Sequence, residues 1–248
     1  MIICHSRKFV FVKTNKTAGS SFEGLLCHYL ADNDMITAVN LKVERDYINT
    51  ILEEKNVVRL NGIASKLDKT VKEQFSQHVP LTVANSVFPE TKDYFSFGIV
   101  RNPFNRHLSS FRWKRGDAIK NLLEKTRNTK KAEQKLQDSF LNFIQRDRGM
   151  LLRRGRNLLQ GTHPDGTSWN VDCIYKLEDL NHLEKDLMIK DIIGDLDTSK
   201  MPRFKSDTVK IPKEINIWNK ELINAVRISS SWEIEQMGYH DTPEDLLN

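Results

Sequence analysis

The sequence predicts an α/β protein with a central, mostly parallel sheet flanked by helices. Three short apolar runs, at residues 9–12, 94–100 and 173–177, have the composition and length of buried strands. Stretches with apolar residues at helical spacing alternate with these runs, and such alternation favours parallel strands joined by helices. A chain of 248 residues with 39% hydrophobic residues can form one sizeable core. We therefore expect a single domain over residues 1–248.

The first strand, Phe9–Val12, runs into the polar segment Lys13–Ser21 and then into a helix. The apolar positions of that helix are Phe22, Leu25, Leu26, Tyr29 and Leu30. Ser20 or Ser21 is placed to cap it, and Glu23 in its first turn would complement the positive end of the helix dipole. The polar segment is either an ordinary turn or an anion cradle, built from backbone N–H groups and a lysine at a helix N-terminus.

The second strand, at residues 94–100, leads into a junction of the same kind. Arg101 stands at its end, and Pro103 suits the first turn of a helix that carries Arg106 and Ser109. Ligands of parallel sheets bind at the carboxyl ends of the strands. Arg101 and Ser109 can therefore bind a second anion through a guanidinium and a hydroxyl, although a surface ion pair is the simpler alternative.

The rest of the chain adds two helices and two loops to the prediction. Apolar residues at helical spacing predict helices at 134–146 and 219–237. The polar stretch 203–210 is predicted to be a long loop. Residues 160–169 form a turn-rich segment that ends in Trp169.

Positive charge is concentrated in one part of the chain. The net charge is +5, but residues 101–160 contain sixteen Lys and Arg against five Asp and Glu, a local charge of +11 that leaves −6 for the remainder. Phe111 and Trp113 lie among these basic residues. The stretch is either a solvated helix face or a groove for an anionic chain molecule, and nothing in it requires nucleic acid.

Several classes of protein are excluded by composition and motifs. The three cysteines are widely spaced without a C-x-x-C pair, so we expect reduced thiols and neither a disulfide framework nor a zinc site. No apolar run approaches a membrane span of about 20 residues, and residues 1–8 lack the apolar core of a signal peptide. We therefore expect a soluble, cytoplasmic protein. Neither the triphosphate loop G-x-x-x-x-G-K-[ST] nor a metal motif occurs, so no metal is predicted.

Two motifs, in order along the chain, resemble those of sulfotransferases that use 3′-phosphoadenosine 5′-phosphosulfate (PAPS). Lys16–Ser21 is similar to the loop of that family for the 5′-phosphosulfate, and Arg101–Ser109 is similar to its 3′-phosphate motif, R-[DN]-P-x-x-R-x-x-S. Residues 77–79, 171–180 and 237–239 resemble the carbohydrate branch, in particular uronyl 2-O-sulfotransferases. The resemblance implies the P-loop-like fold of nucleoside kinases.

The resemblance also implies a donor site, with PAPS as donor and adenosine 3′,5′-bisphosphate (PAP) as product. Lys16 and the backbone through Ser21 would hold the 5′-phosphosulfate, and Arg101 and Ser109 the 3′-phosphate. Asn15 stands where the family usually has proline. Arg203 and Lys205, in the loop at 203–210, can close over the nucleotide. The predicted donor-binding residues are Lys13, Lys16, Thr17, Ala18, Gly19, Ser20, Ser21, Arg101, Ser109, Arg203 and Lys205.

His78 resembles the catalytic base of the uronyl enzymes, and Lys16 is the second implied catalytic residue. An imidazole with a pKa of about 6.5 can accept the proton of an attacking hydroxyl at neutral pH. His107 and His163 are alternative bases. Lys16 would stabilise the charge that builds up on the donor oxygen.

The implied acceptor is a carbohydrate hydroxyl, held by Arg112, Lys114, Arg115 and Trp169. O-sulfation and N-sulfation both remain open. Two other functions are alternatives: a polyanion-binding protein without catalysis, and a kinase-like phosphotransferase.

Overall fold

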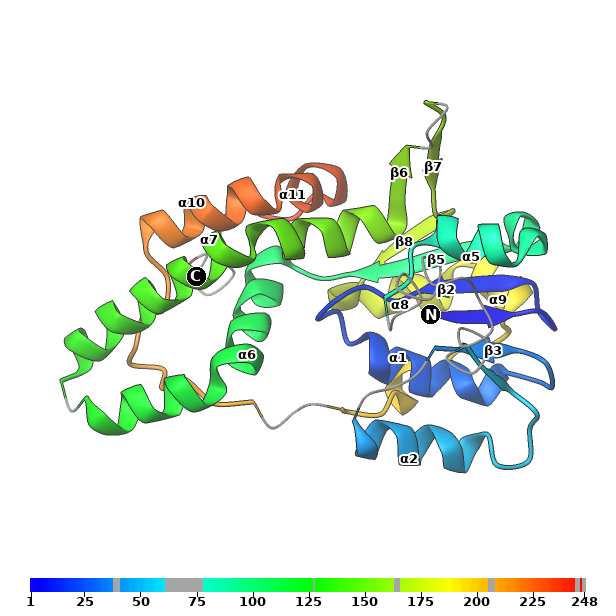
Figure 1. Cartoon of the computed structure of the whole chain (residues 1–248), viewed down its shortest axis with the longest axis horizontal. Helices are drawn as coiled ribbons and strands as arrows, with labels where there is room; N and C mark the ends of the chain where they lie inside the picture. The colour runs from blue at the N-terminus through cyan, green and yellow to red at the C-terminus, as the bar shows by residue number, and fades with distance from the viewer. Residues whose placement is uncertain are drawn as a thin grey trace. The chain divides into compact units, whose positions relative to one another are not determined.

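The computed structural model in Figure 1 describes residues 1–37, 41–60, 78–126, 128–162, 166–204, 208–243 and 246. The chain divides into two units, each with its own apolar core. Unit 1 comprises Met1–Val100 and Arg154–Phe204, and unit 2 comprises Arg101–Arg153 and Lys205–Asn248. The prediction of one domain stays a prediction.

Unit 1 is built on a sheet of six strands in the order β4-β3-β1-β2-β5-β8. The strands are β1 (Ile2–Cys4), β2 (Phe9–Val12), β3 (Met35–Ile36), β4 (Val58–Arg59), β5 (Phe95–Val100) and β8 (Cys173–Lys176). The neighbours β2, β5 and β8 run parallel, as do β3 and β4, whereas β1 is antiparallel to both of its neighbours. The predicted α/β class and mostly parallel sheet are therefore confirmed, along with the three predicted strands.

The helices of unit 1 lie between these strands and after β8 in the sequence. They are α1 (Gly19–Leu26), η1 (Cys27–Tyr29), α2 (Lys42–Ile51), α5 (Leu81–Val87), η2 (Pro89–Asp93), η3 (Leu177–Asp179), α8 (Leu180–Lys185), α9 (Leu187–Ile192) and η4 (Thr198–Lys200). The helices α1, α2, α8 and α9 contribute apolar side chains to one core with alternate residues of β2 and β5. In that core the rings of Phe11 and Phe22 lie 5.0 Å apart, which fixes α1 against β2.

The opposite face of β5 has a glycine at its centre. A Cβ on Gly98 would lie 2.2 Å from Cδ2 of Leu159, so the Leu159 side chain occupies the space that any larger residue would need. Leu159 ends α7 (Thr129–Leu159), and it is followed by the hairpin of β6 (Gln160–Thr162) and β7 (Ser168–Asn170). The segment predicted as a turn-rich loop at 160–169 contains two short strands, because residues 160–162 pair with residues 168–170.

Unit 2 is helical. It contains α6 (Pro103–Lys125), α7 up to residue 153, α10 (Lys220–Ser229) and α11 (Ser231–Met237). The core of this unit includes Phe111, whose ring stacks on Phe140 at 4.6 Å, and Trp218, whose ring lies 5.4 Å from that of Phe104. The helix predicted at 134–146 is part of the longer α7.

The helix predicted at 219–237 is two helices, divided at Ser230, which has non-helical φ and ψ angles of −133° and 28°. Ser229 and Ser230 are buried there and direct their hydroxyls to His107 of α6. Among the described residues, no helix is long and apolar enough to cross a membrane. The three cysteines are free, as predicted.

Candidate active site

The predicted anion loop joins β2 to α1 and crosses the carboxyl end of β5. Val12, the last residue of β2, is in register with Gly98 of β5. The Thr14 hydroxyl then donates to the Ile99 carbonyl at 2.5 Å and lies 2.8 Å from the Thr17 hydroxyl. The loop is therefore tied to the sheet edge at which ligands of parallel sheets bind.

Two residues of the loop have a left-handed backbone: Lys16 with φ 61° and Ala18 with φ 55°. Turns of this kind direct successive N–H groups toward one side and form concave sites for anions. Ala18 precedes the first residue of α1, whose first N–H groups have no partner within the helix. The loop thus combines backbone donors, the Lys16 ammonium and the positive end of a helix dipole.

The start of α1 differs from the prediction. The helix begins at Gly19, and Ala18 is its N-cap residue without a side-chain cap, so the predicted capping by Ser20 or Ser21 is wrong. Both serines lie within the first turn and are buried. The left-handed Ala18 starts the helix earlier than a serine cap would.

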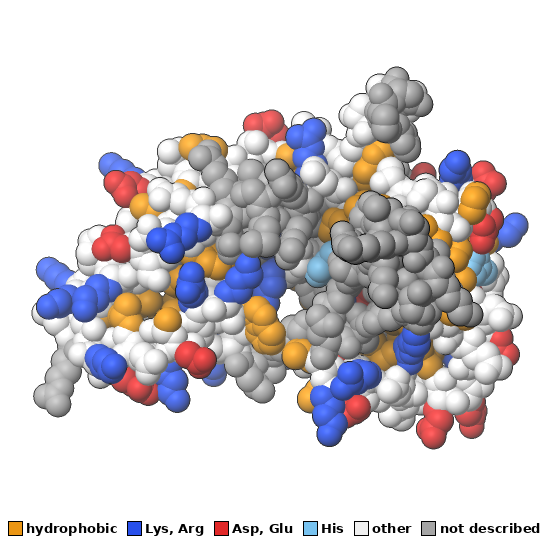
Figure 2. Space-filling model, viewed as in Figure 1, with side chains coloured by type: hydrophobic (Ala, Val, Ile, Leu, Met, Phe, Trp, Pro, Cys, Tyr) orange, Lys and Arg blue, Asp and Glu red, His pale blue; other side chains and the backbone are white. Residues whose placement is uncertain are grey.

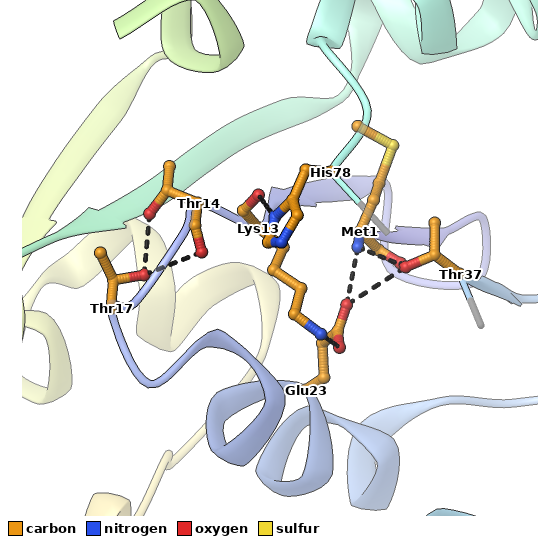
Figure 3. Close-up of polar contacts among 7 residues, drawn as sticks. All are labelled: Met1, Lys13, Thr14, Thr17, Glu23, Thr37 and His78. Carbon is orange, nitrogen blue, oxygen red and sulfur yellow. Dashed lines mark hydrogen bonds and ion pairs between the residues drawn. The ribbon is translucent and has the colours of Figure 1, made fainter. Parts of the chain in front are cut away.

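The prediction that Glu23 complements the helix dipole is wrong, because Glu23 lies beyond the first turn of α1. Its carboxylate is completely buried and pairs with the Lys13 ammonium at 2.5 Å and with the Met1 amino group at 2.6 Å (Figure 3). Burial, the largest influence, raises the pKa of Glu23, but these two positive charges outweigh it and the pKa is lowered. The only carboxylate between residues 13 and 26 is therefore neutralised by pairing.

Lys13 is placed differently from Lys16. Its side chain is 4% exposed and its ammonium is paired with Glu23. The methylene stem of Lys13 passes close to Gly19, where a Cβ would lie 2.7 Å from the Lys13 Cγ and 3.4 Å from the Thr14 carbonyl oxygen. That Lys13 binds the sulfuryl donor stays a prediction. Its observed contacts are with Glu23 and His78 of the same unit.

We expect Gly19→Ala to destabilise the protein by about 1–3 kcal/mol, the usual cost of overpacking a filled site. The added methyl group would meet a lysine stem that the Glu23 pair holds in place. Urea unfolding measures the effect. Gly116→Ala in α6 is the matched control, because nothing lies within 4 Å of a Cβ at Gly116; equal stabilities of the two variants would contradict the prediction.

His78 lies beside the loop, with its Nδ1 atom 3.0 Å from the Lys13 carbonyl oxygen (Figure 3). Burial lowers the pKa of His78 to about 4, and the nearby Lys13 ammonium adds to the effect, although the contact with the carbonyl opposes it. The imidazole is therefore neutral at pH 7, the state that a general base requires. The structure brings this predicted base and the predicted anion loop together.

The segment that precedes Lys205 packs on α1. The Phe204 N–H donates to the Ser21 hydroxyl at 3.3 Å, and the Phe204 ring meets Tyr47 of α2 edge-on at 5.4 Å. Arg203 is exposed and directly precedes Phe204. Because Phe204 is hydrogen-bonded to Ser21, the backbone of Arg203 is held next to the first turn of α1 and close to the anion loop. Lys205 lies outside the described residues.

The second motif opens α6 in unit 2. Asn102 caps this helix, with its side-chain oxygen accepting from the N–H groups of Phe104 at 3.0 Å and Asn105 at 3.3 Å. Pro103 is the first helical residue, as predicted. Arg101 directly follows β5, and Ser109 lies about two turns into α6. Both side chains are partly exposed.

His107, one of the alternative bases, is 1% exposed, and its Nε2 atom lies 3.0 Å from the Ser230 hydroxyl and 3.2 Å from that of Ser229. Burial lowers the pKa of His107 to about 3, with a smaller effect of the neighbouring Arg106 charge. A side chain so enclosed cannot reach an acceptor hydroxyl. His107 instead connects α6 to the serines between α10 and α11 in the interior of unit 2. His163, the other alternative, lies outside the described residues.

A comparison with family models matches residues 1–218 to the sulfotransferase family, a range that includes parts of both units. The chain belongs to the sulfotransferase family. The predicted family is thus confirmed, and the α/β structure agrees with its fold. No curated protein and no solved structure matches the chain.

The predicted acceptor residues of this sulfotransferase have different surroundings. Arg112 donates from Nε to the Val209 carbonyl at 2.6 Å, so it holds a neighbouring segment of unit 2. The Lys114 ammonium lies 5.5 Å from the centre of the Phe143 ring and is exposed. Arg115 is exposed at a kink in α6, where its φ is −120°. Lys114 and Arg115 are therefore accessible to an anionic ligand.

Most of the basic stretch, residues 101–153, belongs to unit 2. Figure 2 shows Lys and Arg side chains gathered over α6 and α7, mixed with acidic ones. Trp113 is 45% exposed among them, whereas Phe111 is in the core and is not accessible to a sugar. In unit 1, Trp169 of β7 packs across Gly161, where a Cβ would lie 2.7 Å from the indole Nε1.

The sequence does not give the roles of two residues of the site. Thr14 connects the loop to β5, and its signal is a hydroxyl residue two positions after a strand. Glu23 neutralises Lys13, and its signal is a single carboxylate among the apolar residues of α1. Among the described residues, no three His, Cys, Asp or Glu side chains gather as a metal site would require.

Proposed function

We propose that this sulfotransferase uses PAPS as its donor and transfers the sulfuryl group to a hydroxyl of an anionic carbohydrate. The observation that carries the proposal is the loop Lys13–Ser21 at the carboxyl end of β2. It leads into α1 through two left-handed residues and is tied to β5 by Thr14. Such a loop suits a phosphosulfate.

The groups available in the loop fit the donor. They are backbone N–H groups, hydroxyls and an ammonium, all of which bind anionic oxygens. The single carboxylate in the sequence of the loop and α1, Glu23, is paired with Lys13 and Met1 and does not oppose an anion. When bound, PAPS supplies a sulfuryl group attached to a phosphate leaving group.

The proposed roles follow from position and chemistry. Lys16 stabilises the charge that develops on the leaving oxygen, and the backbone of residues 16–21 holds the 5′ end of the donor. Arg101 and Ser109 bind the 3′-phosphate, a role supported by the motif that they share with the family. Arg203, whose backbone is fixed beside α1 by the Phe204–Ser21 hydrogen bond, binds the donor as well.

His78 takes the proton from the acceptor hydroxyl in this proposal. The low pKa of its imidazole keeps it neutral at pH 7, and its contact with the Lys13 carbonyl places it beside the donor loop. Lys114, Arg115 and Trp169 are proposed to bind the acceptor, with Arg112 supporting them. Exposed cations and an indole suit the acidic groups and the sugar faces of an anionic carbohydrate.

Thermal unfolding with PAP tests the proposed donor. A ligand that binds only the folded protein, at 100 times its Kd, stabilises it by about 2.7 kcal/mol, which corresponds to roughly 5–10 °C in Tm for a protein of this size. Adenosine 5′-phosphate and Mg-ATP are the controls. We expect stabilisation by PAP alone at matched concentrations.

Transfer of labelled sulfate from PAPS to a panel of oligosaccharides then identifies the acceptor. Uronate-containing chains are expected to be labelled and neutral glucans are not. A response to Mg-ATP only, or no response to any nucleotide, would overturn the proposed donor.

A further inference from the structure

Lys13 makes one polar contact through its side chain and another through its backbone. Its ammonium pairs with the buried Glu23 carboxylate at 2.5 Å, and its backbone carbonyl lies 3.0 Å from Nδ1 of His78. Figure 3 shows the side chain running to Glu23 while the imidazole lies against the carbonyl. One residue thus connects α1 to the predicted base.

The contact with a carbonyl determines which nitrogen of His78 carries the proton. A carbonyl oxygen can only accept a hydrogen bond, so Nδ1 must be the donor. In a neutral imidazole with Nδ1–H, the other nitrogen, Nε2, carries the lone pair. Nε2 is therefore the atom that can accept a proton from an acceptor hydroxyl.

The Lys13 carbonyl is fixed from several directions. Val12 precedes it in register with Gly98 of β5, and Thr14 follows it with a 2.5 Å hydrogen bond to Ile99. At the end of the Lys13 side chain, the ion pair with Glu23 holds the ammonium. The missing Cβ of Gly19 leaves room for the stem that connects the two ends.

We propose that Lys13 is a positioning residue for His78 and not a ligand of the sulfuryl donor, with Glu23 holding Lys13 in place. The proposal rests on the proposed function, in which His78 is the base. It differs from the sequence prediction, which placed both Lys13 and Lys16 on the donor. In this proposal, Lys16 binds the donor and Lys13 positions the base His78.

The tautomer of His78 is the first test, because it can be measured without substrates. In protein labelled with ¹⁵N-histidine, the long-range ¹H–¹⁵N spectrum distinguishes the two neutral tautomers and the cation, and His78→Asn assigns the signals. We expect the Nδ1–H form at pH 7. The Nε2–H form or the cation would overturn the proposal.

The second test separates donor binding from turnover. Lys13→Met combined with Glu23→Gln removes the Lys13–Glu23 ion pair and keeps the stem of residue 13. The Met1 amino group also loses its carboxylate partner, but burial already lowers its pKa to about 6, so it can stay neutral at pH 7. We expect the Kd for PAP to stay within about threefold of the wild type. The kcat should fall by about 10- to 100-fold, the scale for a misplaced catalytic group.

Lys8→Met, in the exposed turn between β1 and β2, is the control and should change neither value. A rise of tenfold or more in the Kd for PAP in the double variant would show that Lys13 binds the donor and would overturn the proposal. If the double variant does not fold, the tautomer of the wild type still decides. A wild-type protein that neither binds PAP nor transfers sulfate would contradict the proposed function instead, whatever the tautomer.

Discussion

Replacing Lys16 by alanine is expected to lower kcat by about 10²- to 10³-fold, or roughly 2.7–4 kcal/mol in transition-state stabilisation. Lys16 has a left-handed backbone at the centre of the loop, between the end of β2 and the first turn of α1. A cation at this position stabilises negative charge on the departing oxygen, and that charge is larger in the transition state than in the bound donor. The measurement is steady-state sulfuryl transfer from PAPS.

The control for this variant is Lys8→Ala. Lys8 also has a positive φ, of 56°, and is exposed in the turn before β2, so the same substitution at the same backbone conformation is tested away from the loop. Lys8→Ala should retain full activity. A Lys16→Ala enzyme with the kcat of the wild type would show that the developing charge is stabilised by other groups.

The sheet could be predicted because its central strands have a strong local signal. The runs at 9–12, 94–100 and 173–177 are mostly apolar, as strands in the centre of a parallel sheet are. The strand Ile2–Cys4 was missed, because three apolar residues beside a charged turn give no periodicity. Its place in the sheet comes from pairing with β2 and β3, which is a tertiary effect.

The site was predicted as far as local sequence determines it. The position of the loop between β2 and α1, and the helix opened by Pro103, follow from residue types and their order. The contact of His78 with Lys13 could not be predicted, because it joins residues 65 positions apart. The inward direction of Lys13 depends on a carboxylate one turn into the next helix, and composition alone could not distinguish it from Lys16.

The buried ion pair of unit 2 gives the largest expected effect on stability. The Arg106 guanidinium contacts the Glu233 carboxylate at 2.5 Å, with both side chains 3% exposed, and also donates to the Ser230 hydroxyl. Glu233→Ala leaves the Arg106 charge buried without its carboxylate, so we expect a loss of about 3–5 kcal/mol in the free energy of unfolding. This pair fixes α11 against α6, the helix that carries the second motif.

Urea unfolding followed by tryptophan fluorescence measures this loss, since three of the four tryptophans (Trp113, Trp218 and Trp232) belong to unit 2. The control is Asp241→Ala, which breaks the exposed Arg227–Asp241 pair of the same unit and should cost no more than about 1 kcal/mol. The double variant Arg106→Met/Glu233→Leu should lose less than Glu233→Ala, because it removes both charges and fills the space with apolar groups. Equal losses for Glu233→Ala and Asp241→Ala would mean that burial adds nothing to the pair, and α11 would then be held by its apolar contacts alone.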